Sequence, residues 1–242
     1  MTLRIQCWSG PRNISTAFMY AWAQRPDTTV VDEPLYAAYL ARFDRGHPMV
    51  DAVLTAQSSD PRQVIEEVIL GPCGTPVLFM KQMAHHLRGL SDTSFLGMTE
   101  NIFLIRHPDD MLRSLSVQLP DCDLDDTGLP EQVDVLERVL AAGGHPVVVD
   151  SRSVLADPAG VLVAVCARIG LEFTNAMLSW PAGPKPYDGA WAPAWYANVH
   201  ESTGFGAPRP SRHDPLPRRF EPILADALPL YERLAEYAVA GS

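Results

Sequence analysis

The sequence predicts an α/β protein of three layers, in which a central, mostly parallel sheet is covered by helices on both faces. Short apolar runs of strand length alternate with segments of helical length up to residue 180, which is typical of parallel sheets. With 47% hydrophobic and 20% charged residues in a chain of 242, the protein can bury a sizeable core. We therefore expect a single domain over residues 1–242.

Each strand is predicted from a short apolar or β-branched run. These runs cover residues 3–8, 28–31, 77–80, 101–105 and 147–149. The first run has no basic segment before it and no long apolar stretch leading to a small-residue cleavage site. It is therefore expected to be a buried strand and not a signal peptide.

The helices are predicted mainly from the signals at their ends. They are expected over residues 15–24, 61–70, 108–118, 131–142, from 157 onward, and 221–239. Hydroxyl residues suit the start of the first helix, and Asp109 and Asp110 suit the positive end of the third. Gly143 suits the end of the fourth, and Pro158 suits the first turn of the fifth. Residues 181–220 are rich in proline and are expected to form an irregular covering segment.

Charge, hydropathy and cysteine spacing exclude several classes of function. The formal net charge is −10 and no basic stripe is visible, so we expect no nucleic-acid partner. No run of 18 apolar residues is present, so no membrane span is expected. The four cysteines are scattered and have no metal-ligand spacing, which predicts a reduced, cytoplasmic protein without a metal. The sequence does not indicate an oligomeric state.

The loop after the first predicted strand, residues 9–13, is a candidate anion site. It leads into a helix, whose first N–H groups and positive dipole end attract anions. Arg12 adds a charge suited to phosphate or sulfate, and Ser15 and Thr16 add hydroxyl donors. The Walker A pattern is absent. The alternative is an ordinary loop in which Ser15 caps the helix.

A second candidate anion site begins where the strand 101–105 ends. Arg106 follows this strand directly, and Ser114 lies eight residues later in the predicted helix. Open α/β sheets bind ligands at the carboxyl ends of their strands. The alternative is that Arg106 pairs with Asp109 or Asp110 at the surface.

Four segments share the order and spacing of a known family. They are PRNIST at 11–16, the Arg106…Ser114 pair, the stretch 147–162, and the turn GLEF at 170–173. Together they resemble the superfamily of sulfotransferases that use 3′-phosphoadenosine-5′-phosphosulfate (PAPS), which has a P-loop NTPase-like fold. The N-terminal run also resembles an uncharacterised bacterial and plant branch of this superfamily, some of whose members carry an aminotransferase-like name. We see no lysine-centred pyridoxal site to support that name.

The resemblance implies a sulfotransferase that moves a sulfuryl group from PAPS, its co-substrate, to the hydroxyl or amine of a small-molecule acceptor without a metal. It implies that the loop binds the 5′-phosphosulfate through Arg12, Asn13, Ile14, Ser15 and Thr16, and that Arg106 and Ser114 bind the 3′-phosphate. Ile14 stands where the family usually has glycine, so the backbone there cannot use the conformations open only to glycine.

Catalytic groups are expected at the ends of the second and third strands. Glu33 falls where some sulfotransferases carry a glutamate that removes the acceptor's proton. Lys81 matches a family lysine that stabilises the leaving phosphate oxygen. His85 or His86 is the rival base, since cytosolic sulfotransferases use a histidine shortly after this strand, although adjacent histidines are more typical of packing. Asp32 is expected to cap a helix or to form a salt bridge.

The covering segment resembles only loosely the loop that closes over the nucleotide in this family. Lys185, Gly189 and Trp191 match that loop, and aromatic packing onto the sheet is an equal alternative. Four arginines are candidates for the 3′-phosphate or for an acidic acceptor, or are simply solvated: Arg209, Arg212, Arg218 and Arg219. The acceptor pocket is expected to involve residues 36–60 and this segment.

Two other functions remain open at this point. The first is an ATP-dependent kinase, which is disfavoured because the Walker lysine is missing and only Asp150 is a clear strand-end aspartate for magnesium. The second is a nucleotide-binding protein without catalysis, for which Ile14 is the best argument.

Overall fold

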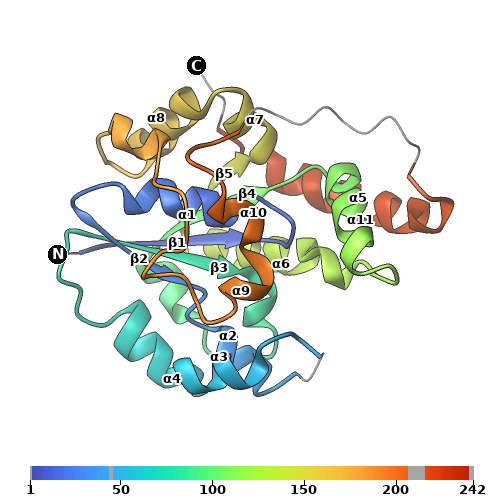
Figure 1. The fold of residues 1–242 in the computed structure, drawn as a ribbon, viewed down its shortest axis with the longest axis horizontal. Coiled ribbons are helices and arrows are strands. Elements are labelled where there is room, and N and C mark those ends of the chain that lie inside the picture. Colours follow the sequence, from blue (N-terminus) through green and yellow to red (C-terminus); the bar gives the residue numbers. More distant parts are fainter. Residues whose placement is uncertain (1, 44–45, 207–215, 240–242) are drawn as a thin grey trace.

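The computed structural model describes residues 2–43, 46–206 and 216–239. Its centre is one five-stranded sheet in the order β2-β3-β1-β4-β5, and every neighbouring pair is parallel (Figure 1). The strands are β1 (Leu3–Ser9), β2 (Thr28–Asp32), β3 (Val77–Met83), β4 (Glu100–Ile105) and β5 (Val147–Asp150). The predicted α/β class and parallel sheet are confirmed.

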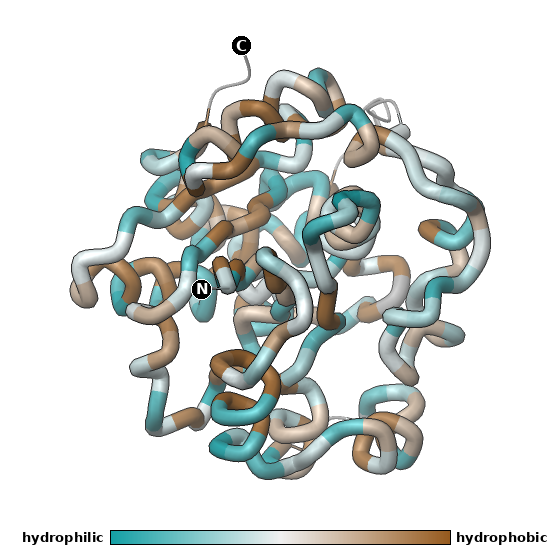
Figure 2. The backbone as a smooth tube through the Cα atoms, turned by 90° about the vertical axis from the view of Figure 1, so that its left-hand side faces the viewer, coloured by the Kyte–Doolittle hydropathy of each residue, from teal (hydrophilic) through white to brown (hydrophobic). Residues whose placement is uncertain are grey.

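Helices of very different length connect the strands and continue the chain after the last one. The α-helices are α1 (Ser15–Ala23), α2 (Tyr36–Leu40), α3 (Val50–Ala56), α4 (Pro61–Val64), α5 (Pro108–Gln118), α6 (Leu129–Ala141), α7 (Ser151–Ala156), α8 (Pro158–Arg168), α9 (Ala192–Trp195), α10 (Ala197–His200) and α11 (Glu221–Ala235). The 3₁₀ and π turns are η1 (Ile65–Ile69, π), η2 (Ala84–Leu87), η3 (Ser94–Met98), η4 (Asp125–Thr127), η5 (Asn175–Leu178) and η6 (Arg218–Phe220). Hydrophobic and hydrophilic residues alternate along many of the outer helices, as amphipathic helices require (Figure 2).

Each face of the sheet buries its own apolar cluster, which produces the three predicted layers. Side chains alternate along a strand. Ile5 and Cys7 of β1 therefore pack with α1, α7 and α8, whereas Trp8 packs on the opposite face with α5, α6 and α11. No helix in the described ranges is long and apolar enough to cross a membrane.

Several boundaries differ from the prediction for identifiable reasons. β3 continues three residues past Met80, so Lys81 lies within the strand and not after it. The helix 61–70 turns from α to π at Ile65. The helix α7 was not predicted. The chain leaves α11 at Ala235 and returns to the sheet, where Val239 N donates to the carbonyl of Val148 at 2.9 Å.

Candidate active site

The candidate site lies where β1, β2 and β3 end, beneath the segment that carries α9 and α10 (orange in Figure 1). The parallel register pairs Asp32 at the end of β2 with Lys81 in β3. Glu33 follows with a left-handed φ of 39°, which is uncommon for a residue with a Cβ. Its N–H donates to the carbonyl of Lys81 at 2.9 Å. Both carboxylates therefore reach the same lysine.

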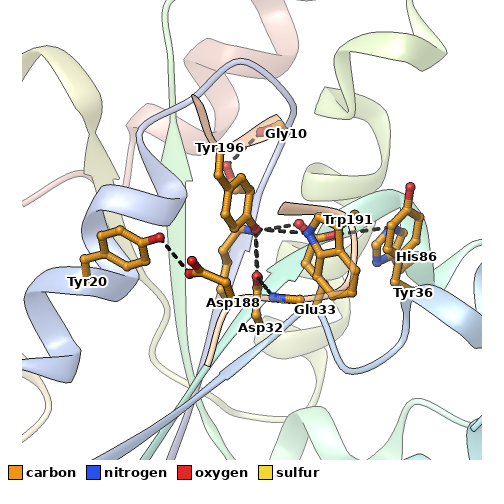
Figure 3. Close-up of polar contacts among 12 residues, drawn as sticks. Gly10, Tyr20, Asp32, Glu33, Tyr36, His86, Asp188, Trp191 and Tyr196 are labelled. Carbon is orange, nitrogen blue, oxygen red and sulfur yellow. Dashed lines mark hydrogen bonds and ion pairs between the residues drawn. The ribbon is translucent and has the colours of Figure 1, made fainter. Parts of the chain in front are cut away.

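A buried ammonium group holds this cluster together. Lys81 Nζ donates to Asp32 Oδ1 at 2.8 Å, to Glu33 Oε1 at 2.5 Å and to the hydroxyl of Tyr196 at 2.6 Å. Its side chain is 2% exposed, and all three N–H donors have an acceptor. Figure 3 shows Asp32, Glu33, Trp191 and Tyr196 converging at this point. Of the two roles expected for Asp32, helix capping or a salt bridge, the structure shows the salt bridge.

The two carboxylates outnumber the one cation, and this imbalance shifts their proton affinity. Burial raises the pKa of Glu33 to about 7; the charge of Lys81 opposes the shift and that of Asp32 adds to it. Burial alone lowers the pKa of Lys81, but the carboxylates of Asp32 and Glu33 outweigh it and hold that pKa well above its usual value. Glu33 is thus a group able to exchange a proton near neutral pH.

Glu33 and His86, two candidates for the catalytic base, are neighbours in the structure. His86 Nε2 lies 3.8 Å from Glu33 Oε2, and its ring stacks on Tyr36 with a centroid separation of 4.7 Å and an interplanar angle of 9°. Burial is the main cause that lowers the pKa of His86 well below its usual value, so the imidazole is neutral. His85 packs against the rings of Tyr39 and His86. The structure thus places His86 beside Glu33.

The raised pKa of Glu33 predicts a pH-dependent contribution to stability. A carboxyl whose folded pKa is raised stabilises the fold at low pH, and this contribution is lost as the pH rises from about 4.5 through about 7. We expect the free energy of unfolding of the unmodified protein to fall relative to Glu33→Gln by on the order of 2–3 kcal/mol between those limits. Urea unfolding at pH 5 and pH 8 measures this difference. The exposed Glu66→Gln should show no such change, and a pH-independent difference for Glu33→Gln would contradict the assignment.

The predicted phosphate loop is fixed mainly by Asn13. Its Nδ2 donates to the carbonyl of Leu104 at the end of β4 at 2.8 Å, and its Oδ1 accepts from Ile14 N at 2.8 Å. Ile14 occupies the N-cap of α1 with φ −90°, whereas the left-handed residue of the loop is Arg12 with φ 55°. The substitution of the family's glycine by Ile14 is therefore compatible with this backbone. Ser15 is the first residue of the helix and not its cap.

A segment that the sequence did not single out supports the same loop. A Cβ on Gly10 would lie 2.5 Å from the carbonyl oxygen of Thr127, so only glycine fits this close approach. Gln132 Nε2 donates to the carbonyls of Trp8 and Leu104, each at 3.2 Å. The start of α6 and the residue Thr127 before it thus pack directly against the end of β1.

The two candidate anion sites meet at Arg12. Arg12 Nε donates to Ser114 Oγ at 3.0 Å, and Arg106 Nη1 donates to the carbonyl oxygen of Arg12. Burial lowers the pKa of Arg12. Two guanidinium groups and a hydroxyl therefore come from the β1–α1 loop, the end of β4 and helix α5. Ser15 is buried and Thr16 half-buried in the first turn of α1.

The acids proposed as alternative partners of Arg106 are engaged by other arginines. Arg113 binds Asp109 at 2.8 Å, and Arg152 binds Asp110 at 2.9 Å. The ion pairs found for these two acids therefore involve neighbouring arginines.

The covering segment is pinned to the sheet edge by the residues that resemble the family loop. Gly189 N donates to Asp32 Oδ2 at 3.1 Å, and Trp191, 1% exposed, donates from Nε1 to the hydroxyl of Tyr196 at 3.0 Å. Lys185 Nζ lies 5.1 Å above the ring of Tyr20. In this structure Trp191 is a packing residue.

The remaining candidates contribute little to the described site. Arg209 and Arg212 lie outside the described residues, and Arg218 and Arg219 are exposed. Within the described ranges, no group of three or more His, Cys, Asp or Glu side chains is arranged to hold a metal ion.

The comparisons with known proteins agree with this architecture. A family model for a sulfotransferase domain matches residues 3–238, so the chain belongs to the sulfotransferase domain family. The sulfotransferase domain of the Synechococcus PCC 7002 olefin synthase superposes with a TM-score of 0.57 at 18% identity, covering 97% of this chain and 96% of that one. A sulfotransferase from Alicyclobacillus acidocaldarius gives 0.56 at 12% identity, with 98% and 95% coverage. At such identities these structures support the fold, which is P-loop-like.

Two plant proteins are closer in sequence. The branched-chain-amino-acid aminotransferase-like proteins 1 and 2 of Arabidopsis thaliana are 37% identical over 238 residues and 35% identical over 231 residues. The alignments cover 96% and 95% of this chain but only 42% and 41% of the plant proteins. The chain therefore spans about two fifths of the length of these relatives.

Proposed function

We propose that this chain transfers a sulfuryl group from PAPS to a hydroxyl or amine of a small-molecule acceptor by metal-free in-line displacement. The observation that carries the proposal is the convergence of Arg12, Arg106 and Ser114 at the carboxyl end of the sheet. Two cationic groups and a hydroxyl at one place suit a ligand with more than one anionic group, and PAPS has a 5′-phosphosulfate and a 3′-phosphate. The free thiols of all four cysteines suit a reducing compartment such as the cytoplasm.

In the proposed reaction, the acceptor oxygen attacks sulfur while its proton passes to Glu33. The bond between sulfur and the bridging phosphate oxygen breaks, and adenosine 3′,5′-bisphosphate leaves. Loop residues 12–16 bind the phosphosulfate. Lys81 stabilises the leaving oxygen. Because all three of its N–H groups already donate to Asp32, Glu33 or Tyr196, one of these bonds must break first. In the reactive state, in which Glu33 is ionised as the base, the hydroxyl of Tyr196 is the one uncharged acceptor of the three, so we assign the exchange to that contact.

The proposal predicts that transfer needs no added metal. The positive charge that offsets the developing negative charge comes from Arg12, Arg106 and Lys81. We expect EDTA to leave the conversion of PAPS to adenosine 3′,5′-bisphosphate unchanged, as followed by chromatography with a mixture of small hydroxyl and amine acceptors. Strict dependence on magnesium together with phosphate transfer from ATP would favour the kinase alternative. Tight binding of PAPS without turnover on any acceptor would favour a nucleotide-binding protein without catalysis.

A further inference from the structure

The two carboxylates on Lys81 have unequal surroundings. Asp32 uses both oxygens, since Oδ1 accepts from Lys81 at 2.8 Å and Oδ2 accepts from the Tyr196 hydroxyl at 2.7 Å and from Gly189 N at 3.1 Å. Within the part of the chain that the structure describes, Glu33 accepts through Oε1 alone, from Lys81 at 2.5 Å. Its Oε2 faces His86 Nε2 at 3.8 Å, beyond hydrogen-bonding distance. Three donors thus stabilise Asp32 as an ion, whereas one stabilises Glu33.

This asymmetry decides which carboxyl group carries a proton. Hydrogen bonds to the charged form of an acid favour that form. The geometry therefore favours Asp32 as the ionic partner of Lys81, and it makes Glu33 the better placed of the two carboxyls to carry an exchangeable proton. Two of the three donors to Asp32 come from the covering segment and not from the sheet.

Tyr196 is the centre of this arrangement. Its hydroxyl accepts from Lys81 Nζ at 2.6 Å and from Trp191 Nε1 at 3.0 Å, and it donates to Asp32. The residue is 5% exposed, between α9 and α10. The titratable groups around the two carboxyls are Lys81 from β3, His86 from η2, Tyr36 from α2 and Tyr196 itself.

We propose that Tyr196 is a positioning residue whose hydroxyl keeps the exchangeable proton on Glu33 and off Asp32, so that residues 189–196 form part of the base machinery. This inference rests on the proposed role of Glu33 as the base. Without the hydroxyl, Asp32 loses a donor to its charged form and competes for the proton. Glu33 then becomes a weaker base although it makes no direct contact with Tyr196.

The test replaces Tyr196 with Phe and follows the two carboxyl groups by ¹³C NMR in protein labelled at the Asp and Glu side-chain carboxyls. Glu33→Gln and Asp32→Asn assign the signals. In the unmodified protein we expect the near-neutral titration to be carried by Glu33. In Tyr196→Phe we expect the proton occupancy to shift toward Asp32 by about tenfold or more, the effect of one lost bond to a charged group. We also expect kcat to fall roughly 3- to 10-fold, with KM for PAPS unchanged.

Tyr187→Phe is the matched control. It makes the same chemical change in the same covering segment, where the ring of Tyr187 packs against Tyr20 with centroids 5.8 Å apart. Its hydroxyl forms no hydrogen bond within the described ranges. We expect this variant to leave both carboxyl signals unchanged. An equal effect of the two variants, or no effect of Tyr196→Phe, overturns the proposal.

A double variant separates action through Asp32 from a general loosening of the fold. In an Asp32→Asn background, Tyr196→Phe should not move the midpoint of the Glu33 titration further. A further shift as large as that of the single variant overturns the proposal.

Should Tyr196→Phe fail to fold, Asp32→Asn and Trp191→Phe test the same hydrogen-bond network. Asp32→Asn should lower the midpoint of the Glu33 titration, and Trp191→Phe should leave the proton on Glu33. The NMR titration needs no acceptor, so a protein that fails to transfer sulfuryl groups would refute the proposed function and still leave the role of Tyr196 measurable.

Discussion

Glu33→Gln is expected to lower sulfuryl transfer by about 10²–10⁴-fold while leaving the binding of adenosine 3′,5′-bisphosphate nearly unchanged. The loss follows from removal of the group that accepts the acceptor's proton. Nucleotide binding is spared because the contacts assigned to it come from Arg12, Arg106 and Ser114, which converge with one another, whereas Glu33 is hydrogen-bonded to Lys81. Steady-state rates of bisphosphate release and calorimetric titration of the bisphosphate measure the two quantities.

The glutamine variant preserves the packing of the site. Gln is nearly isosteric with Glu, and its amide oxygen can still accept the bond from Lys81 that Glu33 Oε1 accepts at 2.5 Å. Asp32 remains to neutralise Lys81. In the unmodified protein the rate should rise with pH through about 7, as a base with the raised pKa of Glu33 loses its proton. Glu66→Gln, on an exposed face, is the control for the chemical change itself.

The opposite outcome has a clear meaning. If His86→Ala or His85→Ala abolishes transfer and Glu33→Gln does not, the base is a histidine and the assignment of Glu33 is wrong. The separation of 3.8 Å between His86 Nε2 and Glu33 Oε2 makes this comparison necessary, because a change at either residue alters the surroundings of the other. The neutral state of buried His86 is compatible with a base, so protonation alone does not decide between them.

The sequence predicts the sheet well because its five strands are short apolar runs with clear ends. The predicted runs and the observed strands agree within three residues at every end, and the largest difference is the extension of β3 to Met83. That extension carries polar residues, Lys81 and Gln82, which a search for apolar runs excludes. Their burial becomes possible only because side chains distant in sequence provide partners, such as Asp32 for Lys81 and Gln6 for Gln82.

The covering segment was the least predictable part of the site. Tyr196 follows Lys81 by more than a hundred residues and lies in a segment without helical or strand periodicity, so no local pattern connects it with Asp32. The tight packing of Trp191, which belongs to this segment, was expected only as one of two alternatives. The same limit applies to Arg12, whose contact with Ser114 depends on how far the β1–α1 loop and α5 approach each other.

The second large effect concerns the 3′-phosphate. Arg106→Ala is expected to weaken binding of adenosine 3′,5′-bisphosphate by about 10- to 150-fold, because a charge-assisted contact contributes roughly 1.5–3 kcal/mol. AMP lacks the 3′-phosphate, so the substitution should weaken its binding much less. The unmodified protein should accordingly bind the bisphosphate far better than AMP or ADP. Calorimetric titration of the bisphosphate and of AMP into the unmodified protein and into Arg106→Ala measures the four dissociation constants.

The contact between Arg106 and the carbonyl oxygen of Arg12 makes AMP an essential internal control. Alanine at position 106 also removes a support of the phosphate loop, and that loss weakens both ligands equally. The ratio of bisphosphate to AMP affinity therefore isolates the 3′-phosphate, and we expect it to fall at least about tenfold. Arg138→Ala, whose side chain pairs with Asp134 on α6, should leave both affinities and their ratio unchanged. Equal affinity of the unmodified protein for the bisphosphate and AMP would remove the main support for sulfuryl transfer, because the convergence of Arg106 and Ser114 on Arg12 would then have no second anionic group to bind.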